Sequence, residues 1–337
     1  MKAAIFKGAG QPLAIEEVPE PVPGPHEAVV RVSRCGICGT DVSMTSGVGW
    51  NYPLGSALGH EFCGEVVSLG PDVERLRIGD RLAVMPQAGC GACRPCIAGR
   101  PLDCERGFRM MMGGLGEFTL ADERWSVKLP STLSETDGAL IEPMASALRG
   151  VRMGGVDATS RIAVIGVGAM GAGAIYWSRR QGASRVAALA RSARRRDLAS
   201  TMGATSLVPM PSEPGAVAEA LQGAPDIVFE CTGAPEMVSA AIDLVRPGGT
   251  IVFIGICGGS ASFVPAAATM KEAVIRFTSA YSLEEFQATA DAFDAGGVEP
   301  RSLVDRRVGL DEVPAVLEAM RSGSSQALKT HVHLHRP

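Results

Sequence analysis

The sequence predicts an α/β protein with two domains, one an irregular β unit and the other built around a parallel sheet. Three observations support this prediction. The chain has 337 residues, more than a single domain usually contains. Residues 1–146 are rich in Gly and Pro and carry short β-type runs between turn signals. From about residue 160, strand-like and helical segments alternate at the spacing of βαβ units.

In the first part of the chain, strands are expected at residues 27–33, 63–69 and 81–85. Turn signals separate them, among them Pro-Gly-Pro at residues 23–25 and Gly-Pro-Asp at residues 70–72. Short strands divided by such turns indicate an irregular all-β unit, in the form of a small barrel.

The parallel sheet is expected from strand-like runs at 161–165, 184–190, 226–230 and 249–256, with helical segments to about residue 181, at 194–202 and at 237–245. After residue 280 the pattern predicts helices at 283–295 and 310–321 and a strand at 328–335. His331, His333 and His335 alternate and would share one face of this last strand, where we expect three exposed imidazoles and no metal site.

Composition and charge exclude several classes of protein. Hydrophobic residues make up 46% and charged residues 20% of the chain, as in soluble globular proteins. The formal net charge is −4, which leaves no basic surface for a phosphate backbone. Charged residues interrupt the N-terminal region, and the longest uncharged apolar stretch, residues 162–177, is short for a membrane span. We therefore expect a cytoplasmic protein that binds neither nucleic acid nor membrane.

Four of the nine cysteines are crowded into one Gly/Pro-rich loop. In a chain without export signals, such crowding indicates a metal more readily than disulfides. Four thiolates suit a tetrahedral zinc and leave no position for a substrate, so a structural zinc is predicted, with an iron–sulfur cluster as the alternative. The ligands would be Cys90, Cys93, Cys96 and Cys104.

A second set of ligand types is dispersed along the chain. Cys-Gly-Ile-Cys-Gly-Thr-Asp occupies residues 35–41, Gly-His-Glu residues 59–61 and Glu-Pro residues 142–143. One thiolate, one imidazole and one carboxylate would make a three-ligand zinc site with an open fourth position, as a reactive metal requires.

A glycine-rich turn follows the apolar strand expected at 161–165. Gly166, Gly168, Ala169, Met170 and Gly171 lie in the pattern G-x-G-x-x-G at the start of a helix. The glycines permit a tight turn and close backbone approach, and the helix N-terminus faces a pyrophosphate with its positive end. Dinucleotide binding is therefore predicted.

The choice of cofactor depends on the end of the second strand, where an NAD enzyme places a carboxylate for the 2′-hydroxyl. Here the strand ends in Ala190 and is followed by Arg191, Ser192 and further arginines up to Arg196. The missing acid and the cations favour NADP(H) over NAD(H). The alternative is that these arginines form an ordinary solvated helix face.

Together these motifs resemble the zinc-containing medium-chain dehydrogenase/reductase family, which includes alcohol and polyol dehydrogenases. The resemblance extends over essentially the whole chain, from Pro-Gly-Pro-His-Glu at residues 23–27 to the nucleotide fold. It implies a GroES-like β-barrel catalytic domain formed by residues 1–146 and 281–337. It also implies a doubly wound Rossmann domain at residues 147–280.

The same resemblance implies roles for the dispersed metal ligands. Cys38 and His60 would bind a catalytic zinc, so that the chain would hold two zinc ions. Glu142 would be the third ligand or would hold the zinc-bound water, and Glu61 would lie behind the zinc and exchange with that water. Which carboxylate ligates zinc at rest stays open. Cys35 falls outside the ligand set and is expected to be structural.

Further residues are placed around the reacting centre by the resemblance. Thr40 would hydrogen-bond the substrate oxygen, and Asp41 would orient the histidine ligand. Many relatives carry a relay histidine where this chain has Ser43, so the proton would leave through Ser43 or through the ribose hydroxyl and water. Cys231 and Thr232 would lie in a loop beside the nicotinamide.

The predicted function is the reversible oxidation of a secondary alcohol, cyclic or polyol-like, to its ketone or aldehyde. Trp50 and Met110–Met112 are candidates for the substrate pocket, although core packing explains the methionines equally well. The alternatives are an amino-alcohol or sugar/cyclitol biosynthetic dehydrogenase and a non-catalytic NADPH-binding sensor or scaffold. From the resemblance we also expect a homo-oligomer, either a dimer or a tetramer.

Overall fold

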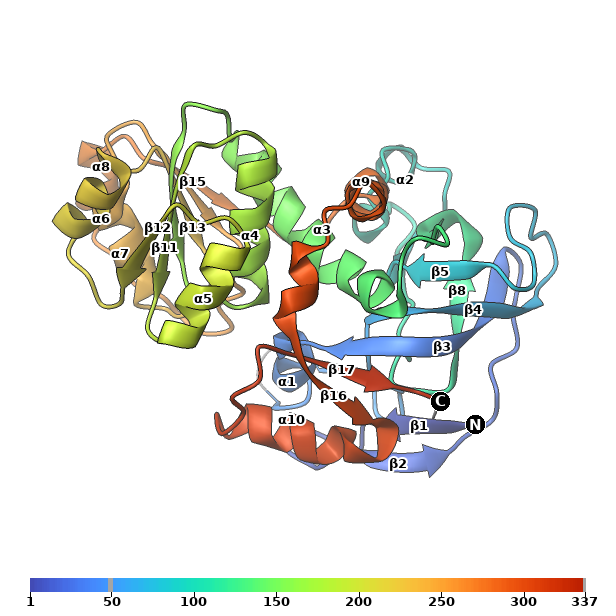
Figure 1. Ribbon diagram of the computed structural model, residues 1–337. Helices are drawn as coiled ribbons and strands as arrows, with labels where there is room; N and C mark the ends of the chain where they lie inside the picture. Colours follow the sequence, from blue (N-terminus) through green and yellow to red (C-terminus); the bar gives the residue numbers. More distant parts are fainter. Residues whose placement is uncertain (48–50, 336–337) are drawn as a thin grey trace. The chain divides into compact units, whose positions relative to one another are not determined.

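The computed structural model describes residues 1–47 and 51–335, so the pocket candidate Trp50 lies outside the described residues. The chain forms two compact units, Met1–Glu142 with Ser282–Pro337 and Pro143–Tyr281 (Figure 1). The first unit is therefore assembled from both ends of the chain, and each unit has its own sheet and hydrophobic core.

The first unit consists mainly of β-strands. Its strands are β1 (Lys2–Ile5), β2 (Ala14–Glu17), β3 (Glu27–Ile37), β4 (Glu61–Leu69), β5 (Arg81–Val84), β6 (Gln87–Ala88), β7 (Arg109–Met110), β8 (Phe118–Asp122), β9 (Ser126–Lys128), β16 (Val304–Gly309) and β17 (Lys329–His333). Its helices are α1 (Gly39–Ser43), α2 (Arg94–Ile97), η1 (Pro101–Asp103), η2 (Glu123–Trp125), α9 (Leu283–Asp294), η3 (Glu299–Leu303), η4 (Leu310–Glu312) and α10 (Val313–Arg321). Helix α3 (Glu135–Gly154) begins in this unit and ends in the second.

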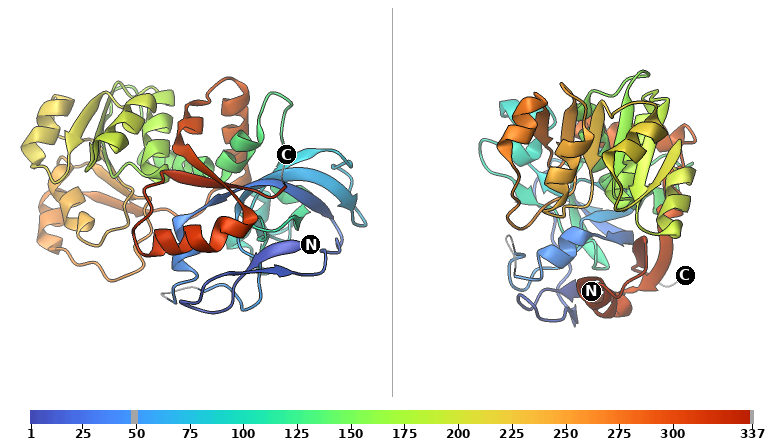
Figure 2. Two further views of the ribbon diagram at one scale, coloured as in Figure 1. Left: turned by 60° about the horizontal axis from the view of Figure 1, so that its bottom comes forward. Right: turned by 90° about the vertical axis from the view of Figure 1, so that its left-hand side faces the viewer.

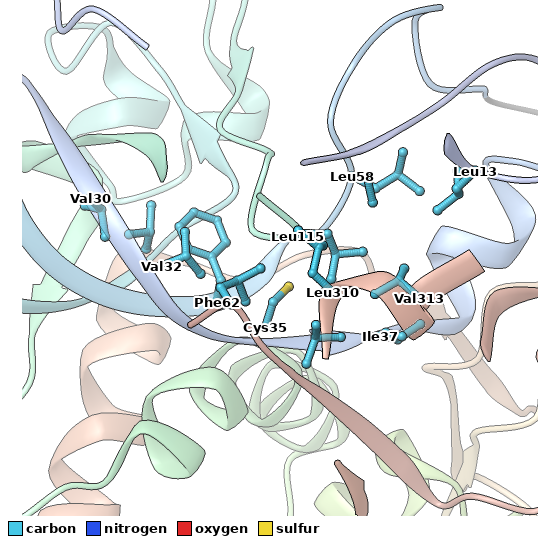
Figure 3. Packing of buried hydrophobic residues seen from close by; sticks show 14 of the residues in the cluster. Leu13, Val30, Val32, Cys35, Ile37, Leu58, Phe62, Leu115, Leu310 and Val313 are labelled. Atoms are coloured by element: carbon cyan, nitrogen blue, oxygen red, sulfur yellow. The ribbon is translucent and has the colours of Figure 1, made fainter. Parts of the chain in front are cut away.

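A seven-stranded sheet with the order β16-β17-β3-β4-β5-β9 forms the frame of the first unit, and β8 pairs with the beginning of β3. Strand β3 extends four residues beyond its predicted end at 33, because Cys35 and Ile37 continue the alternation of buried side chains. Its core packs residues of β3 and β4 against Leu115 and α10 (Figure 3). Cys35 points into this apolar core beside Phe62 (Figure 3).

Strand β17 is an inner strand, paired with β16 on one side and with β3 on the other. The expectation of three exposed imidazoles is therefore wrong. His331 is fully buried, His333 is half-buried and His335 alone is exposed. The predicted helix at 310–321 is the short helix η4 followed by α10, whose apolar face packs onto the sheet (Figure 2).

The second unit is a layered α/β structure. Its strands are β10 (Arg161–Ile165), β11 (Arg185–Ala190), β12 (Ser206–Pro209), β13 (Ile227–Glu230), β14 (Thr250–Phe253) and β15 (Val274–Phe277), and its helices are α4 (Ala169–Arg180), α5 (Ala193–Thr201), α6 (Pro214–Leu221), α7 (Met237–Leu244) and α8 (Pro265–Met270).

All strand pairs of this sheet are parallel, in the order β12-β11-β10-β13-β14-β15. The order is that of the Rossmann fold, as the alternating pattern predicted. Helices α4 and α5 lie on one face, and α6 and α7 pack on the other against a cluster that includes Ile165 and Phe253 (Figure 1). The order reverses between β10 and β13, and ligands of such sheets bind at the carboxyl ends of the strands at this point.

None of the helices in the described part of the chain is both long and apolar enough to cross a lipid bilayer.

Candidate metal centres and nucleotide site

The four clustered cysteines come together on a lobe of the first unit. Strand β6, helix α2 and helix η1 supply the loop, and Gly91 turns it with a φ of +75°. Two side chains of η2 fix its base, because Trp125 Nε1 donates to the carbonyl of Gly89 at 3.1 Å and Arg124 donates to that of Cys90 at 3.3 Å. The lobe is thus held by hydrogen bonds at its base, and a metal ion bound by the four sulfur atoms would hold its tip.

The sulfur geometry fits a tetrahedral metal. The sulfur atoms of Cys90 and Cys96 lie 3.9 Å apart, and those of Cys93 and Cys104 lie 3.8 Å apart. Ligands about 2.3 Å from a tetrahedral zinc are separated by about 3.8 Å. Backbone N–H groups of Ala92 and Cys93 lower the pKa of Cys90 to about 6, which favours the thiolate that a metal needs.

A second group of ligand atoms lies at the junction of β3 and β4. Cys38 follows β3, and the antiparallel pairing of Gly36 with Glu61 brings His60 and Glu61 beside it. The ligand atoms of Cys38, His60 and Glu61 lie within 4.8 Å of one another, and the His60 and Glu61 side chains are buried. Glu142, on α3, is not part of this group in the described residues.

Asp41 lies behind the histidine and is fully buried. Its Oδ2 accepts a hydrogen bond from the backbone N–H of Cys38 at 2.9 Å, and its Oδ1 accepts one from the Tyr52 hydroxyl at 2.9 Å. His60 Nδ1 lies 3.3 Å from Oδ1, within ion-pair distance although not aligned for a hydrogen bond. Burial raises the pKa of Asp41, but His60 and these donors lower it overall. Asp41 therefore remains a carboxylate next to His60.

Glu61 has a buried cationic partner that the sequence analysis missed. Lys329 Nζ on β17 donates to Glu61 Oε1 at 2.5 Å, and both side chains are almost completely buried. Gly36 makes room for the pair, because a Cβ there would lie 2.1 Å from Glu61 Oε2. Burial lowers the pKa of Lys329, but the negative charges of Glu61, Cys38 and Glu142 raise it above its usual range. Lys329 Nζ also lies 2.5 Å from Oε2 of Glu61, so the ammonium group faces both oxygens of the carboxylate.

The remaining predicted residues of this centre are placed as follows. Thr40 lies on the first turn of α1, with its hydroxyl oxygen 3.5 Å from Cys38 Sγ. Ser43 lies at the end of α1, is exposed, and donates to the carbonyl of Gly39 at 3.2 Å. Cys35 lies in the apolar core and outside the group of ligands.

In the second unit the glycine-rich turn joins β10 to α4. Gly166 has a φ of +84°, and a Cβ on Gly171 would lie 1.8 Å from the carbonyl oxygen of Gly166, so both positions require glycine. Gly168 is the N-cap of α4, and Ala169 and Met170 open the helix. The turn therefore has the close backbone approach that a pyrophosphate needs.

The arginines follow β11 next to this turn. Arg191 is exposed, and Ser192 caps α5 by accepting a hydrogen bond from the backbone N–H of Arg195 at 3.3 Å. Arg195 reaches back and donates to the carbonyl of Val167 at 2.8 Å, while Arg196 is half-buried. Arg195 thus contacts the glycine-rich turn directly, a detail that depends on the folded loop and has no signal in the sequence.

Cys231 and Thr232 lie next to the glycine-rich turn. The side chain of Thr232 stands beside Gly166, where a Cβ would come within 2.4 Å of Thr232 Cγ2. Cys231 lies next to Gly171. The buried Glu230 holds this loop by accepting hydrogen bonds from the backbone N–H groups of Thr232 and Gly233.

Comparisons with known proteins agree with these features. The family described as Alcohol dehydrogenase GroES-like domain matches residues 24–131, and that described as Zinc-binding dehydrogenase matches residues 169–295. The chain is 32% identical over 329 residues to (R,R)-butanediol dehydrogenase of Bacillus subtilis (strain 168), covering 93% of this chain and 94% of that protein. The chain belongs to the zinc-containing medium-chain dehydrogenase/reductase family.

Two further members of this family show its range. L-galactonate-5-dehydrogenase of Escherichia coli (strain K12) is 34% identical over 254 residues, 72% of this chain and 73% of that one. The NADP-bound structure of a protein assigned to the zinc-binding dehydrogenases, from Sinorhizobium meliloti 1021, is 32% identical with a TM-score of 0.88 and covers 99% of both chains.

As a medium-chain dehydrogenase/reductase, the protein is a zinc-dependent enzyme that interconverts an alcohol and its carbonyl compound with a nicotinamide cofactor. The comparisons give no support to a non-catalytic sensor or scaffold. Its thiolate, imidazole and carboxylate donors at Cys38, His60 and Glu61 are a set that zinc binds.

Proposed function

We propose that this dehydrogenase oxidises a secondary, polyol-like alcohol reversibly with NADP(H), and that each chain holds one catalytic and one structural zinc. The observation that supports the catalytic site is the buried group formed by Cys38, His60 and Glu61. The names of the butanediol and galactonate dehydrogenases support a secondary alcohol as substrate. A substrate panel that compares polyol-like secondary alcohols with cyclic alcohols, amino alcohols and sugars tests this substrate class.

Each side chain around this group has a different role in the proposed reaction. Zinc bound there would act as a Lewis acid on the substrate oxygen. Cys38 and His60 hold the ion, and Asp41 keeps the imidazole in place from behind. Thr40, whose hydroxyl faces Cys38, hydrogen-bonds the substrate oxygen and moves its proton. Ser43, exposed at the end of α1, passes the proton to solvent.

For the third ligand we propose Glu142, with Glu61 as the carboxylate that exchanges with it. Lys329 neutralises Glu61 and so weakens its attraction for a metal ion. The negative charge of Glu142 contributes to the raised pKa of Lys329, which supports a role for Glu142 beside this group. Glu142→Gln is therefore expected to weaken zinc binding more than Glu61→Gln does.

The zinc content of the protein tests the two-site proposal. Elemental analysis should find about two zinc ions per chain in the native protein and about one in Cys38→Ser, because the four-cysteine lobe keeps its own ion. Turnover of secondary alcohols, followed by NADPH formation, should be lost in the variant. One zinc in both proteins, or turnover that survives in Cys38→Ser, would contradict a catalytic metal at Cys38.

The cofactor would lie along the carboxyl edge of the Rossmann sheet. The turn from Gly166 to Gly171 would hold the pyrophosphate, and Arg191, Ser192 and Arg196 would hold the 2′-phosphate of NADP(H). Two features support this assignment: β11 ends in Ala190 without a carboxylate, and α5 begins with cations.

Removing one of these arginines should change the affinity for NADPH but not the affinity for NADH. Arg191→Ala is expected to raise the Kd for NADPH about tenfold and to leave that for NADH unchanged, because only NADPH has the phosphate. Arg185→Ala is the control, since Arg185 is exposed at the opposite end of the same strand. Fluorescence titration measures both constants. Equal changes for the two cofactors would show that the arginines are only a solvated surface.

We assign catalysis to residues 1–146 and 281–337 and nucleotide binding to residues 147–280.

The methionines proposed for the substrate pocket, Met110–Met112, line a cavity of about 350 Å³ in the first unit, together with Met1 and Phe118. The described residues that line it do not include Cys38, His60 or Glu61. Their role in a substrate pocket therefore stays a prediction.

The Rossmann sheet has a free edge that supports a homodimer. Strand β15 pairs only with β14 in the described structure, and Phe277 on β15 is 74% exposed. Nearby, Val264 and Met270 are also exposed apolar residues. An apolar edge strand is a template for pairing, and two identical strands related by a twofold axis satisfy each other's N–H and C=O groups.

Phe277→Lys is expected to halve the mass found by sedimentation, because a lysine at an edge strand opposes pairing. Ile97→Lys, at an equally exposed apolar residue of the cysteine lobe, should leave the mass unchanged. A native monomer, or an oligomer that survives Phe277→Lys, would contradict this interface.

A further inference from the structure

Glu230 is a buried carboxylate to which the proposed function assigns no role. It is the last residue of β13 and is 1% exposed. Oε1 accepts hydrogen bonds from the backbone N–H of Thr232 at 2.6 Å and from the Thr232 hydroxyl, and Oε2 accepts one from the backbone N–H of Gly233 at 3.1 Å. Every donor in this set is neutral.

No lysine, arginine or histidine among the described residues forms an ion pair with Glu230. An ionised group taken out of water is costly unless a charge or hydrogen bonds replace the solvent. Hydrogen bonds satisfy the oxygens here but leave one full negative charge in place. Its field therefore acts on whatever binds at this edge of the sheet.

The topology indicates which part of a dinucleotide lies there. The pyrophosphate binds at the glycine-rich turn after β10, and the 2′ position of the adenosine ribose lies at the end of β11. The adenosine half therefore extends toward β11 and β12, and the nicotinamide half extends to the other side of the switch point, over β13 and β14. Thr232, which stands beside Gly166, is two residues after Glu230 on that side.

We propose that the Glu230 carboxylate makes the protein discriminate between the two redox states of its cofactor, in favour of the oxidised form. The proposal rests on the nicotinamide-dependent function above. The ring of NADP⁺ carries a positive charge, and the hydride that it accepts from the alcohol carbon cancels that charge. A fixed negative charge nearby attracts the ring before the transfer and no longer attracts it afterwards.

This discrimination has a consequence for the direction of the reaction. The carboxylate strengthens binding of the cofactor that alcohol oxidation consumes and adds nothing to the binding of the cofactor that it produces. Product release limits turnover in many enzymes. Glu230 is thus a specificity-determining residue that raises the affinity for the oxidised cofactor without slowing release of the reduced one and without touching the alcohol.

The ratio of the Kd for NADP⁺ to the Kd for NADPH, measured by fluorescence or calorimetric titration, tests the proposal. Glu230→Gln removes the charge and keeps the size of the side chain. Glu230→Ala removes the charge and lets water reach the same three donors, so it serves if the glutamine variant does not fold. Both should raise the ratio roughly three- to tenfold, the effect of one unit charge at moderate distance in a protein.

Thr232→Val is the matched control. It removes the hydroxyl that donates to Oε1 but keeps the charge, so any loosening of the loop should raise both Kd values together and leave the ratio within about twofold of the native value. A ratio that stays unchanged in both Glu230 variants, or a loss of both cofactors alike, would overturn the proposal, since Glu230 would then only hold the loop.

The outcome for the native protein separates this inference from the proposed function. A native protein that binds neither NADP(H) nor NAD(H) contradicts the cofactor site itself. If it binds NAD(H) instead, the same ratio is measured with NAD⁺ and NADH, because the ring and its change of charge are identical. Native binding with an unchanged ratio in the variants contradicts only the role of Glu230.

Discussion

Replacing Lys329 by methionine is expected to lower the free energy of unfolding by about 3–5 kcal/mol. Methionine has a similar length and fills the space, but it leaves Glu61 as an unpaired carboxylate in a site where both side chains are almost completely buried. Removing one partner of a buried ion pair costs more than the pair contributes, because the remaining charge loses its hydrogen-bonded counter-ion and is not reached by water. Urea denaturation of the zinc-loaded protein measures the loss.

The double variant Lys329→Met with Glu61→Gln provides the control. Without a charge on either side chain, most of the lost stability should return, as expected when the uncompensated charge is the cause. A loss below about 1 kcal/mol in the single variant would mean that the pair behaves like a solvent-exposed one. A double variant as unstable as the single one would point to lost packing.

Cys104→Ser is expected to remove one zinc ion and to destabilise the protein by on the order of 5 kcal/mol or more, since structural zinc contributes directly to folding. Four sulfur donors within 4.8 Å of one another repel each other when ionised, and only a cation offsets this. Without the ion, the lobe between Gly89 and Gly107 is anchored by Arg124, by Trp125 and by the backbone N–H of Leu283, which donates to the carbonyl of Gly99. Elemental analysis, limited proteolysis and urea denaturation measure these effects.

Cys63→Ser is the matched control for that experiment. Cys63 is a buried thiol outside both groups of ligands, and it donates to the carbonyl of Glu135 at 3.2 Å, which a hydroxyl can also do. The zinc content of this variant should stay unchanged and the lobe should resist proteolysis as in the native protein. Unchanged zinc content in Cys104→Ser would contradict a four-cysteine site.

Features encoded by neighbouring residues could be predicted from the sequence. The turn from Gly166 to Gly171 depends on a single strand-turn-helix segment, and its positive φ and missing Cβ atoms follow from the glycines themselves. The four sulfur ligands are spaced along one loop, so their proximity also follows from the chain. The parallel sheet was predictable because its strands alternate with helices at regular intervals.

Features formed by distant segments could not be predicted in the same way. The pairing of Lys329 with Glu61 joins residues 268 positions apart, and only the register of β17 against β3 brings them together. The burial of His331 depends on β16 covering the other side of β17, and β16 was not expected. A lysine alternating with histidines in one strand was the only signal of a buried polar face.

The position of β17 determines when the first unit can be completed during synthesis. Residues 143–281 form the Rossmann unit from one continuous segment, which leaves the ribosome before residues 282–337 do. Until residues 329–333 follow, β3 keeps an open edge at Arg34–Ile37 that is free to pair wrongly, and Glu61 has no cation. The nucleotide-binding half can therefore fold co-translationally, whereas the metal-binding half matures only after residues 329–333 have been synthesised.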